Sequence, residues 1–138
     1  MVRTHRPVAT QPDDRETWPQ GFSVTLAWSA PERAQVWVSG DLDYCTSAPL
    51  RGAVEEAVDA GARELVIDLS GVTFLDAGGI GVTVLAARRL GARRTFVVCP
   101  NRWFRGLFRL TGLDRVLTIC PSRDDPRFRP AGLGGETA

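Results

Sequence analysis

The chain has 138 residues, a formal net charge of +1, 43% hydrophobic residues and 24% charged residues. This length suits one domain, because two separate cores would each bury too little surface to offset the entropy of the chain. No segment reaches the roughly 18 uninterrupted apolar residues of a membrane span. Residues 1–21 contain no apolar stretch typical of a secretory signal, so we expect a cytoplasmic protein that does not associate with a membrane.

Both ends of the chain have the composition of tails. Residues 1–21 combine prolines and mixed charges with few large apolar side chains, and residues 123–138 show no periodic apolar pattern. Segments of this kind bury too little surface to hold one conformation. We therefore predict a folded domain over residues 22–122 between a disordered N-terminal tail and a disordered C-terminal tail.

The first half of the domain predicts two strands and a helix. Residues 22–28 alternate between apolar and smaller or polar side chains, and residues 35–39 are rich in β-branched and aromatic types. The intervening Pro31 indicates a turn, so the two strands are expected to form a hairpin. A helix follows from Thr46 or Ser47, either of which can cap it, and ends at Gly61.

The second half predicts alternating strands and helices. Residues 64–69 form an apolar run typical of a central strand, and a helix over residues 77–90 is followed by a buried strand at 95–99. A third amphipathic helix begins near Trp103 and ends at Gly112, and residues 116–120 form the last strand. The order β-β-α-β-α-β-α-β predicts a small α/β domain, with an N-terminal hairpin leading into a mixed sheet packed against helices.

Three segments carry a resemblance to a known family. They are Gly-Asp-Leu-Asp at residues 40–43 with Thr46 nearby, Leu-Val-Ile-Asp-Leu-Ser-Gly-Val-Thr-Phe-Leu-Asp at 65–76, and Leu-Thr-Gly-Leu-Asp at 110–114. At this mutual spacing the chain resembles the STAS family of anti-sigma factor antagonists over residues 22–122.

The resemblance implies a regulatory binding module that is not an enzyme and needs no cofactor or metal. Such a module docks on an anti-sigma factor that is also an ATP-dependent serine kinase, and thereby frees a sigma factor. Phosphorylation of a hydroxyl just after the aspartate reverses docking, because the added charge disturbs the contact. The positions implied as partner-binding are Asp41, Asp43, Thr46, Asp76, Ala77, Gly78, Gly79 and Ile80.

The sequence departs from the family at the phosphorylation position. Ala77 and Gly78 stand where the family places hydroxyl residues, so no phosphorylation is expected there and docking is expected to be phosphorylation-independent. Thr73, expected to point toward the core, and Thr83, about two turns into the helix, are poor replacements. The paired glycines either let a partner approach the backbone closely or merely turn the chain into the helix.

The sequence gives little support for a catalytic, metal or redox site. Asp43 and Asp76 are expected to lie near each other, but no nucleophile or metal-ligand cluster accompanies them, and the single histidine is His5. We expect Asp76 to accept backbone N–H bonds at the helix start and Asp43 to support the docking loop. The cysteines have no CxxC spacing, so free, mostly buried thiols are expected at Cys45, Cys99 and Cys120.

Two alternatives to the antagonist hypothesis stay open. One is a non-enzymatic scaffold subunit of a larger signalling or transport assembly. The other is a nucleic-acid or nucleotide binder that uses the arginines between residues 77 and 113, a stretch without acidic side chains. We favour a solvated face or an acidic protein partner for these arginines, with Trp103 and Phe108 in the core. The arginines are Arg88, Arg89, Arg93, Arg94, Arg102, Arg105 and Arg109.

Overall fold

The computed structural model describes residues 8–9 and 21–128. Within them the chain forms the strands β1 (Val8–Ala9), β2 (Ser23–Ala30), β3 (Arg33–Leu42), β4 (Glu64–Leu75), β5 (Thr95–Val98) and β6 (Thr118–Cys120). The helices are α1 (Ser47–Asp59), α2 (Ala77–Leu90) and α3 (Arg102–Leu110), with short 3-10 turns at Ala92–Arg94 and Leu113–Arg115. No described helix is long and apolar enough to cross a membrane.

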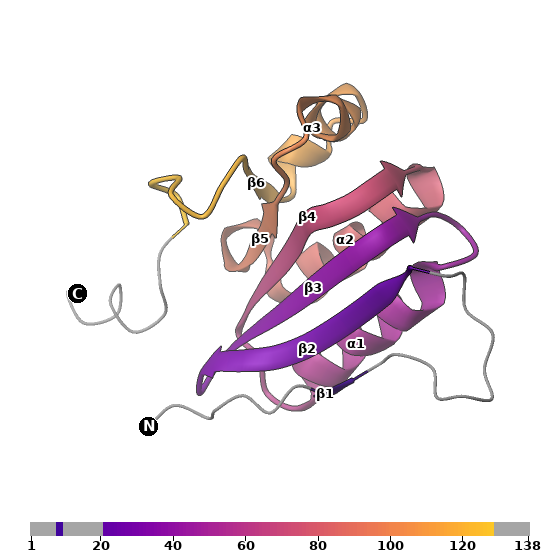
Figure 1. Cartoon of the computed structure of the whole chain (residues 1–138). Coiled ribbons are helices and arrows are strands. Elements are labelled where there is room, and N and C mark those ends of the chain that lie inside the picture. The colour runs from indigo at the N-terminus through magenta and orange to yellow at the C-terminus, as the bar shows by residue number, and fades with distance from the viewer. Residues whose placement is uncertain (1–7, 10–20, 129–138) are drawn as a thin grey trace.

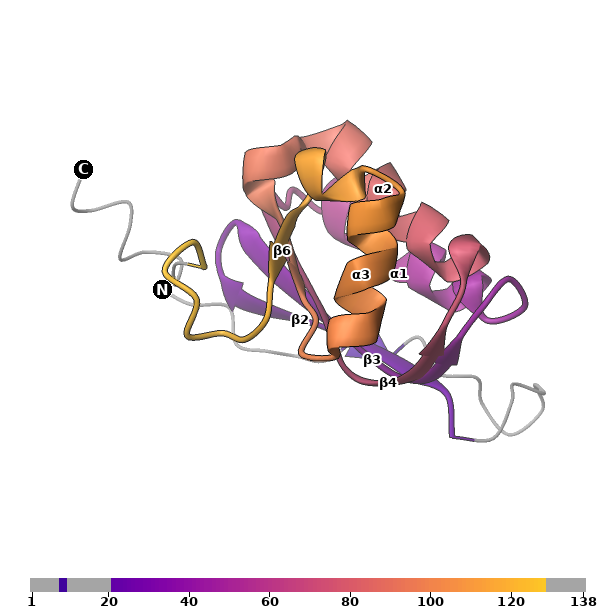
Figure 2. The same cartoon turned by 90° about the horizontal axis from the view of Figure 1, so that it is seen from above.

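The described strands make one mixed sheet in which spatial order equals chain order, β1 to β6. Strands β1, β2 and β3 pair antiparallel, whereas β3, β4, β5 and β6 pair in parallel. Parallel neighbours need crossover connections, and α1, α2 and α3 supply them. These helices all lie on the same side of the sheet (Figures 1 and 2).

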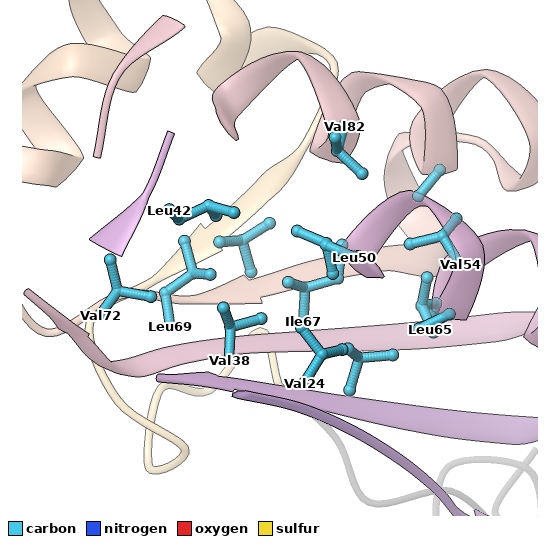
Figure 3. Close-up of a cluster of buried hydrophobic side chains, with 14 of the residues drawn as sticks. Val24, Val38, Leu42, Leu50, Val54, Leu65, Ile67, Leu69, Val72 and Val82 are labelled. Atoms are coloured by element: carbon cyan, nitrogen blue, oxygen red, sulfur yellow. The ribbon is translucent and has the colours of Figure 1, made fainter. Parts of the chain in front are cut away.

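The main core fills the space between the sheet and helices α1 and α2 (Figure 3). Alternate strand residues such as Val38 and Ile67 point toward the helices, where they meet Leu50 of α1 and Val82 of α2. All four side chains are buried. Removing this apolar surface from water is the main source of stability. It also sets the register of the strands, because a shift by one residue would turn the apolar side chains away from the helices.

A smaller cluster lies on the opposite face of the sheet. Val66, Phe96, Val98 and Cys120 are buried there, and Phe128 packs against them from the segment after β6. The rings of Phe96 and Phe128 meet edge to face with centroids 5.8 Å apart. The end of the described chain therefore folds back over the sheet face that carries no helix.

The predicted α/β class, the hairpin and the order of the main elements are confirmed. The observed α2 has the predicted bounds, and the predicted strand at 64–69 extends to Leu75. The tail predictions need correction at two places, because Val8–Ala9 pair with β2 and residues 123–128 pack on the sheet. Residues 1–7, 10–20 and 129–138, the rest of the predicted tails, lie outside the described residues.

Candidate functional site

The residues predicted as partner-binding come from the carboxyl ends of two adjacent parallel strands. Strand β3 ends next to β4, with Leu42 opposite Leu75. The chain leaves β3 into a short loop before α1, and it leaves β4 directly into α2. The Asp76 N–H donates to the carbonyl of Leu42 at 3.3 Å. The two connections thus lie side by side, and we call residues 40–46 and 74–81 the loop–helix edge.

Asp76 caps α2 as the sequence predicted. Its backbone is extended, and Oδ1 accepts the N–H groups of Gly78 at 2.9 Å and Gly79 at 3.1 Å. These are free donors at a helix start, and a capping carboxylate typically stabilises such an end by about 1 kcal/mol. The Asp76 carboxylate is therefore committed to holding the first turn of α2.

Asp43 and Thr46 hold the loop together, which agrees with the supporting role predicted for Asp43. The Thr46 N–H donates to Asp43 Oδ1 at 3.0 Å, and the Asp43 N–H donates to Thr46 Oγ1 at 2.9 Å. Thr46 Oγ1 in turn donates to the carbonyl of Asp41 at 2.7 Å. Thr46 is only 2% exposed, so it shapes the loop from inside and offers no surface to a partner.

The paired glycines let this loop lie against the first turn of α2. A Cβ at Gly78 would stand 2.7 Å from the Cα of Tyr44, and one at Gly79 would stand 2.6 Å from Leu42. Real Cβ atoms essentially never approach so closely, so each substitution would push the loop away from the helix. The backbone that these glycines admit is the chain's own β3–α1 loop. The space that the missing side chains leave is therefore filled by this loop.

The predicted site residues divide by exposure. Asp41 and Ala77 are exposed, and Asp43, Asp76 and Gly78 are partly buried. Thr46, Gly79 and Ile80 are buried, so they lie beneath the surface of the loop–helix edge. The last two face inward because they begin the side of α2 that packs on the core.

Thr73 lies on the surface, against the prediction that it points to the core. Two residues of β3, Gly40 and Asp41, pair with Val72 and Phe74 of β4, so Thr73 is the extra residue of a bulge. The bulge breaks the alternation on which the prediction depended. Thr73 Oγ1 donates to Asp41 Oδ1 at 2.8 Å.

In α2 the only threonine near the loop–helix edge faces inward, and the first two positions carry no hydroxyl. Thr83 is buried and donates to the carbonyl of Ile80 at 2.7 Å. Ala77 is exposed but has only a methyl group, and Gly78 has no room for a side chain. A hydroxyl at position 77 would therefore face solvent, whereas one at position 78 would collide with Tyr44.

Two aromatic residues at the edge were not identified from the sequence. Tyr44 is 81% exposed and Phe74 is 47% exposed. Aromatic side chains dominate the energetics of protein interfaces when they are available on a surface. The available signal was an aromatic residue close to each predicted acidic position, with Tyr44 directly after Asp43 and Phe74 two residues before Asp76. Cys45, in the same loop, is also exposed.

The described residues offer no candidate metal centre, because they contain no group of three or more His, Cys, Asp or Glu side chains able to hold an ion. The carboxylates of Asp41, Asp43 and Asp76 each accept a hydrogen bond from a neighbouring hydroxyl or backbone N–H. The arrangement therefore supports a shaped, rigid contact surface.

The arginines of the second half are spread over three segments. Arg88 and Arg89 end α2, Arg93 and Arg94 lie in the following turn, and the others belong to α3. Phe108 is fully buried as predicted. Trp103 is 81% exposed, so its predicted place in the core was wrong. Phe104 and Phe108 already fill the side of this short helix that faces the sheet.

Comparison with known proteins gives the family. A family model described as "Mlab, STAS domain" matches residues 27–119, which include the whole loop–helix edge. The chain belongs to the STAS domain family. This STAS domain is 34% identical over 110 residues to the anti-sigma-F factor antagonist RsfB of Mycobacterium tuberculosis, covering 78% of this chain and 88% of that one.

Other relatives of this STAS domain have similar names. It is 32% identical over 101 residues to the anti-sigma-B factor antagonist of Listeria monocytogenes, covering 71% of this chain and 88% of the relative. The crystal structure of an anti-sigma factor antagonist from Mycobacterium paratuberculosis matches with a TM-score of 0.69 and 30% identity, covering 80% and 94% of the chains. The resemblance to antagonists predicted from the sequence is thereby confirmed.

A more distant match shares the fold alone. The antagonist SpoIIAA in its unphosphorylated form aligns with a TM-score of 0.54 and 19% identity, covering 68% of this chain and 97% of that one. The α/β arrangement of the STAS domain therefore extends to proteins with little sequence in common with this one.

Proposed function

We propose that this STAS domain is a cytoplasmic, non-enzymatic antagonist that docks through the loop–helix edge on an anti-sigma factor of the serine-kinase type and releases a sigma factor. The exposed pair Tyr44 and Phe74 carries the proposal. These side chains belong to an edge whose backbone is held by hydrogen bonds of Asp43, Thr46 and Asp76. A pre-formed surface loses little entropy on docking, and its aromatic groups supply apolar contact.

Docking is proposed to be independent of phosphorylation. The exposed position after Asp76 has no hydroxyl, and a side chain at the next position would displace the loop that carries Tyr44. A kinase partner would therefore find a contact surface but no acceptor hydroxyl at the two positions after Asp76. Control of the amount of the protein, or of its partner, replaces control by charge.

The first experiment tests the docking surface. The protein is used to capture its anti-sigma factor from an extract of the native cells, and the affinity of the purified pair is measured by calorimetry. Tyr44→Ala and Phe74→Ala are each expected to weaken binding at least tenfold, or about 1.4 kcal/mol, as truncated interface aromatics do. Trp37→Ala is the control, because Trp37 is a 40% exposed aromatic on the helix-free face of the sheet. Unchanged affinity in both edge variants would contradict this docking surface.

The second experiment tests the missing acceptor. Wild-type protein, Ala77→Ser and Gly78→Ser are incubated with the captured partner and labelled ATP. We expect label only on Ala77→Ser, because its new hydroxyl faces solvent while a serine at 78 disturbs the loop. Label on the wild-type protein would contradict phosphorylation-independence. An unlabelled Ala77→Ser that still binds would exclude a partner of the serine-kinase type.

A further inference from the structure

Helix α3 presents apolar side chains to solvent as well as to the core. Its sequence is Arg-Trp-Phe-Arg-Gly-Leu-Phe-Arg-Leu. Phe104, Leu107 and Phe108 pack on the main core. Trp103 and Leu110 are 81% and 84% exposed. Because they are seven residues apart, they lie on one line along the outer surface of the helix.

A basic stripe runs beside this apolar one. Arg102, Arg105 and Arg109 follow the i, i+3, i+7 spacing of a single helix face, and α3 contains no acidic residue. Gly106 lies between the two stripes, and no atom stands within 4 Å of the place where its Cβ would be. The surface between the stripes is therefore open at this position.

Two arginines of this stripe, Arg105 and Arg109, also line a cavity of about 250 Å³ between α3 and the segment after β6. Arg105 is fixed there, because its Nη1 donates to the carbonyls of Cys99 at 2.9 Å and Pro100 at 2.7 Å. The Arg109 side chain makes no hydrogen bond or ion pair with any residue that the structure describes. Arg127 lines the far wall and pairs with Asp125. The remaining lining residues are Asp114, Ile119 and Pro121.

We propose that the outer face of α3 is a second docking surface, which takes an acidic protein segment. A carboxylate of that segment enters the cavity beside Arg105 and Arg109, and an apolar side chain of the same segment covers Trp103 and Leu110. Guanidinium groups suit carboxylates because their N–H donors match the two carboxylate oxygens. Exposed Trp and Arg are also the residue types that contribute most at protein interfaces.

The arrangement fits a protein segment better than a nucleic acid. Single-stranded nucleic acids use successive aromatic side chains as stacking platforms along a basic groove. On α3 the second exposed apolar residue is Leu110, and both phenylalanines pack on the core. The surface of α3 has one apolar stripe beside one basic stripe. An acidic segment with apolar side chains along one side would complement both stripes. The proposal does not depend on the function of the loop–helix edge.

The test uses a synthetic twelve-residue peptide that repeats Glu-Glu-Leu, with its Lys-Lys-Leu counterpart as the charge control. Binding to the ¹⁵N-labelled full chain is followed by NMR, including the indole N–H of Trp103. We expect saturable shifts confined to α3 and the cavity lining with the glutamate peptide, and none there with the lysine peptide. Shifts spread equally over Arg88, Arg89, Arg93 and Arg94 would overturn the proposal, as would no shifts at all.

Two variants make the test specific. Gly106→Gln fills the open surface between the stripes, and it is expected to fold because the site has space and glutamine is the better helix former. It should weaken peptide binding at least tenfold, as should Arg109→Glu. Arg88→Glu makes the same charge change on α2 and should bind as the wild type does. Tighter binding of α3 to a single-stranded oligonucleotide or to phosphatidylglycerol vesicles than to the peptide would also overturn the proposal.

Discussion

The two faces of the sheet are built from neighbouring residues of the same strands, but they are covered in different ways. Toward the helices, side chains such as Ile67 and Val97 join one large apolar cluster under α1 and α2. On the other face, Val66 and Phe96 lie in a small cluster closed by Phe128. Regular helices therefore cover one face, and an irregular segment of the chain covers part of the other.

Two charged side chains are buried on this second face. Asp68 is 6% exposed, and its Oδ2 accepts hydrogen bonds from Arg123 at 2.9 and 3.1 Å. Arg33, 2% exposed, lies 3.5 Å from Glu64 and over the rings of Phe96 and Phe128. Burial lowers the pKa of the Arg33 guanidinium, and Glu64 opposes this effect. The helix face therefore depends on close apolar packing, whereas the other face depends on a few pairings with one segment.

The largest expected difference between the faces comes from removing adjacent core side chains. Ile67→Ala should lower the free energy of unfolding by about 2–5 kcal/mol, because helices and sheet cannot close around the cavity. Val66→Ala should cost about 1–2 kcal/mol, since the irregular cover can move into the space. Urea denaturation monitored by circular dichroism measures both. Equal losses per carbon atom removed would show that the two faces are equally rigid.

The two faces also differ in how well the sequence predicted them. The helix face produces regular alternation in β2 and a 3.6-residue period in α1 and α2, so the elements at 22–28, 46–60 and 77–90 were found almost at their observed bounds. The segment at 123–128 has no period, because it contacts the sheet through the separate side chains of Arg123 and Phe128. Composition alone therefore predicted a tail.

A smaller effect is expected from the ion pair that joins this segment to the sheet. A double-mutant cycle of Asp68→Asn and Arg123→Gln should give a coupling of about 1 kcal/mol, which decreases in high salt. The value is moderate because the Arg123 side chain is 37% exposed and can turn to water when its partner is removed. Urea denaturation of the four proteins provides the cycle. A coupling near zero would mean that aromatic packing alone holds residues 123–128 in place.

The local structure of the loop–helix edge was predicted only in part. The Asp76 cap and the supporting role of Asp43 could be predicted from residue type. A short carboxylate side chain before a helix or turn usually accepts hydrogen bonds from the backbone N–H groups that follow it. Thr73 was misplaced because a bulge leaves no mark in the pattern, and Trp103 because α3 has apolar residues on two sides. The position of Tyr44 depends on the packing of its backbone against Gly78. These residues are far apart in the sequence and meet only in the folded chain, so the sequence pattern gave no sign of the contact.

The smallest expected effect is a difference in the labelling rates of the three cysteines, which serve as probes of the two faces. Cys45 is exposed, Cys99 belongs to the helix-side cluster, and Cys120 belongs to the cluster under Phe128. Burial raises the pKa of the Cys99 thiol to about 11 and also raises the pKa of the Cys120 thiol. Since the thiolate is the reactive form, both buried thiols stay protonated and slow at neutral pH.

Labelling with a thiol reagent at pH 8 should therefore modify Cys45 first, Cys120 more slowly and Cys99 last. Cys120 needs only the opening of residues 121–128, whereas Cys99 needs the main core to unfold, and local openings are more frequent than global ones. Phe128→Ala should speed the labelling of Cys120 several-fold while the rate at Cys99 barely changes, and mass spectrometry of timed samples assigns each site. If Cys120 and Cys99 were instead labelled together in this variant, the two faces would unfold as one unit and the segment would be as integral to the domain as its helices.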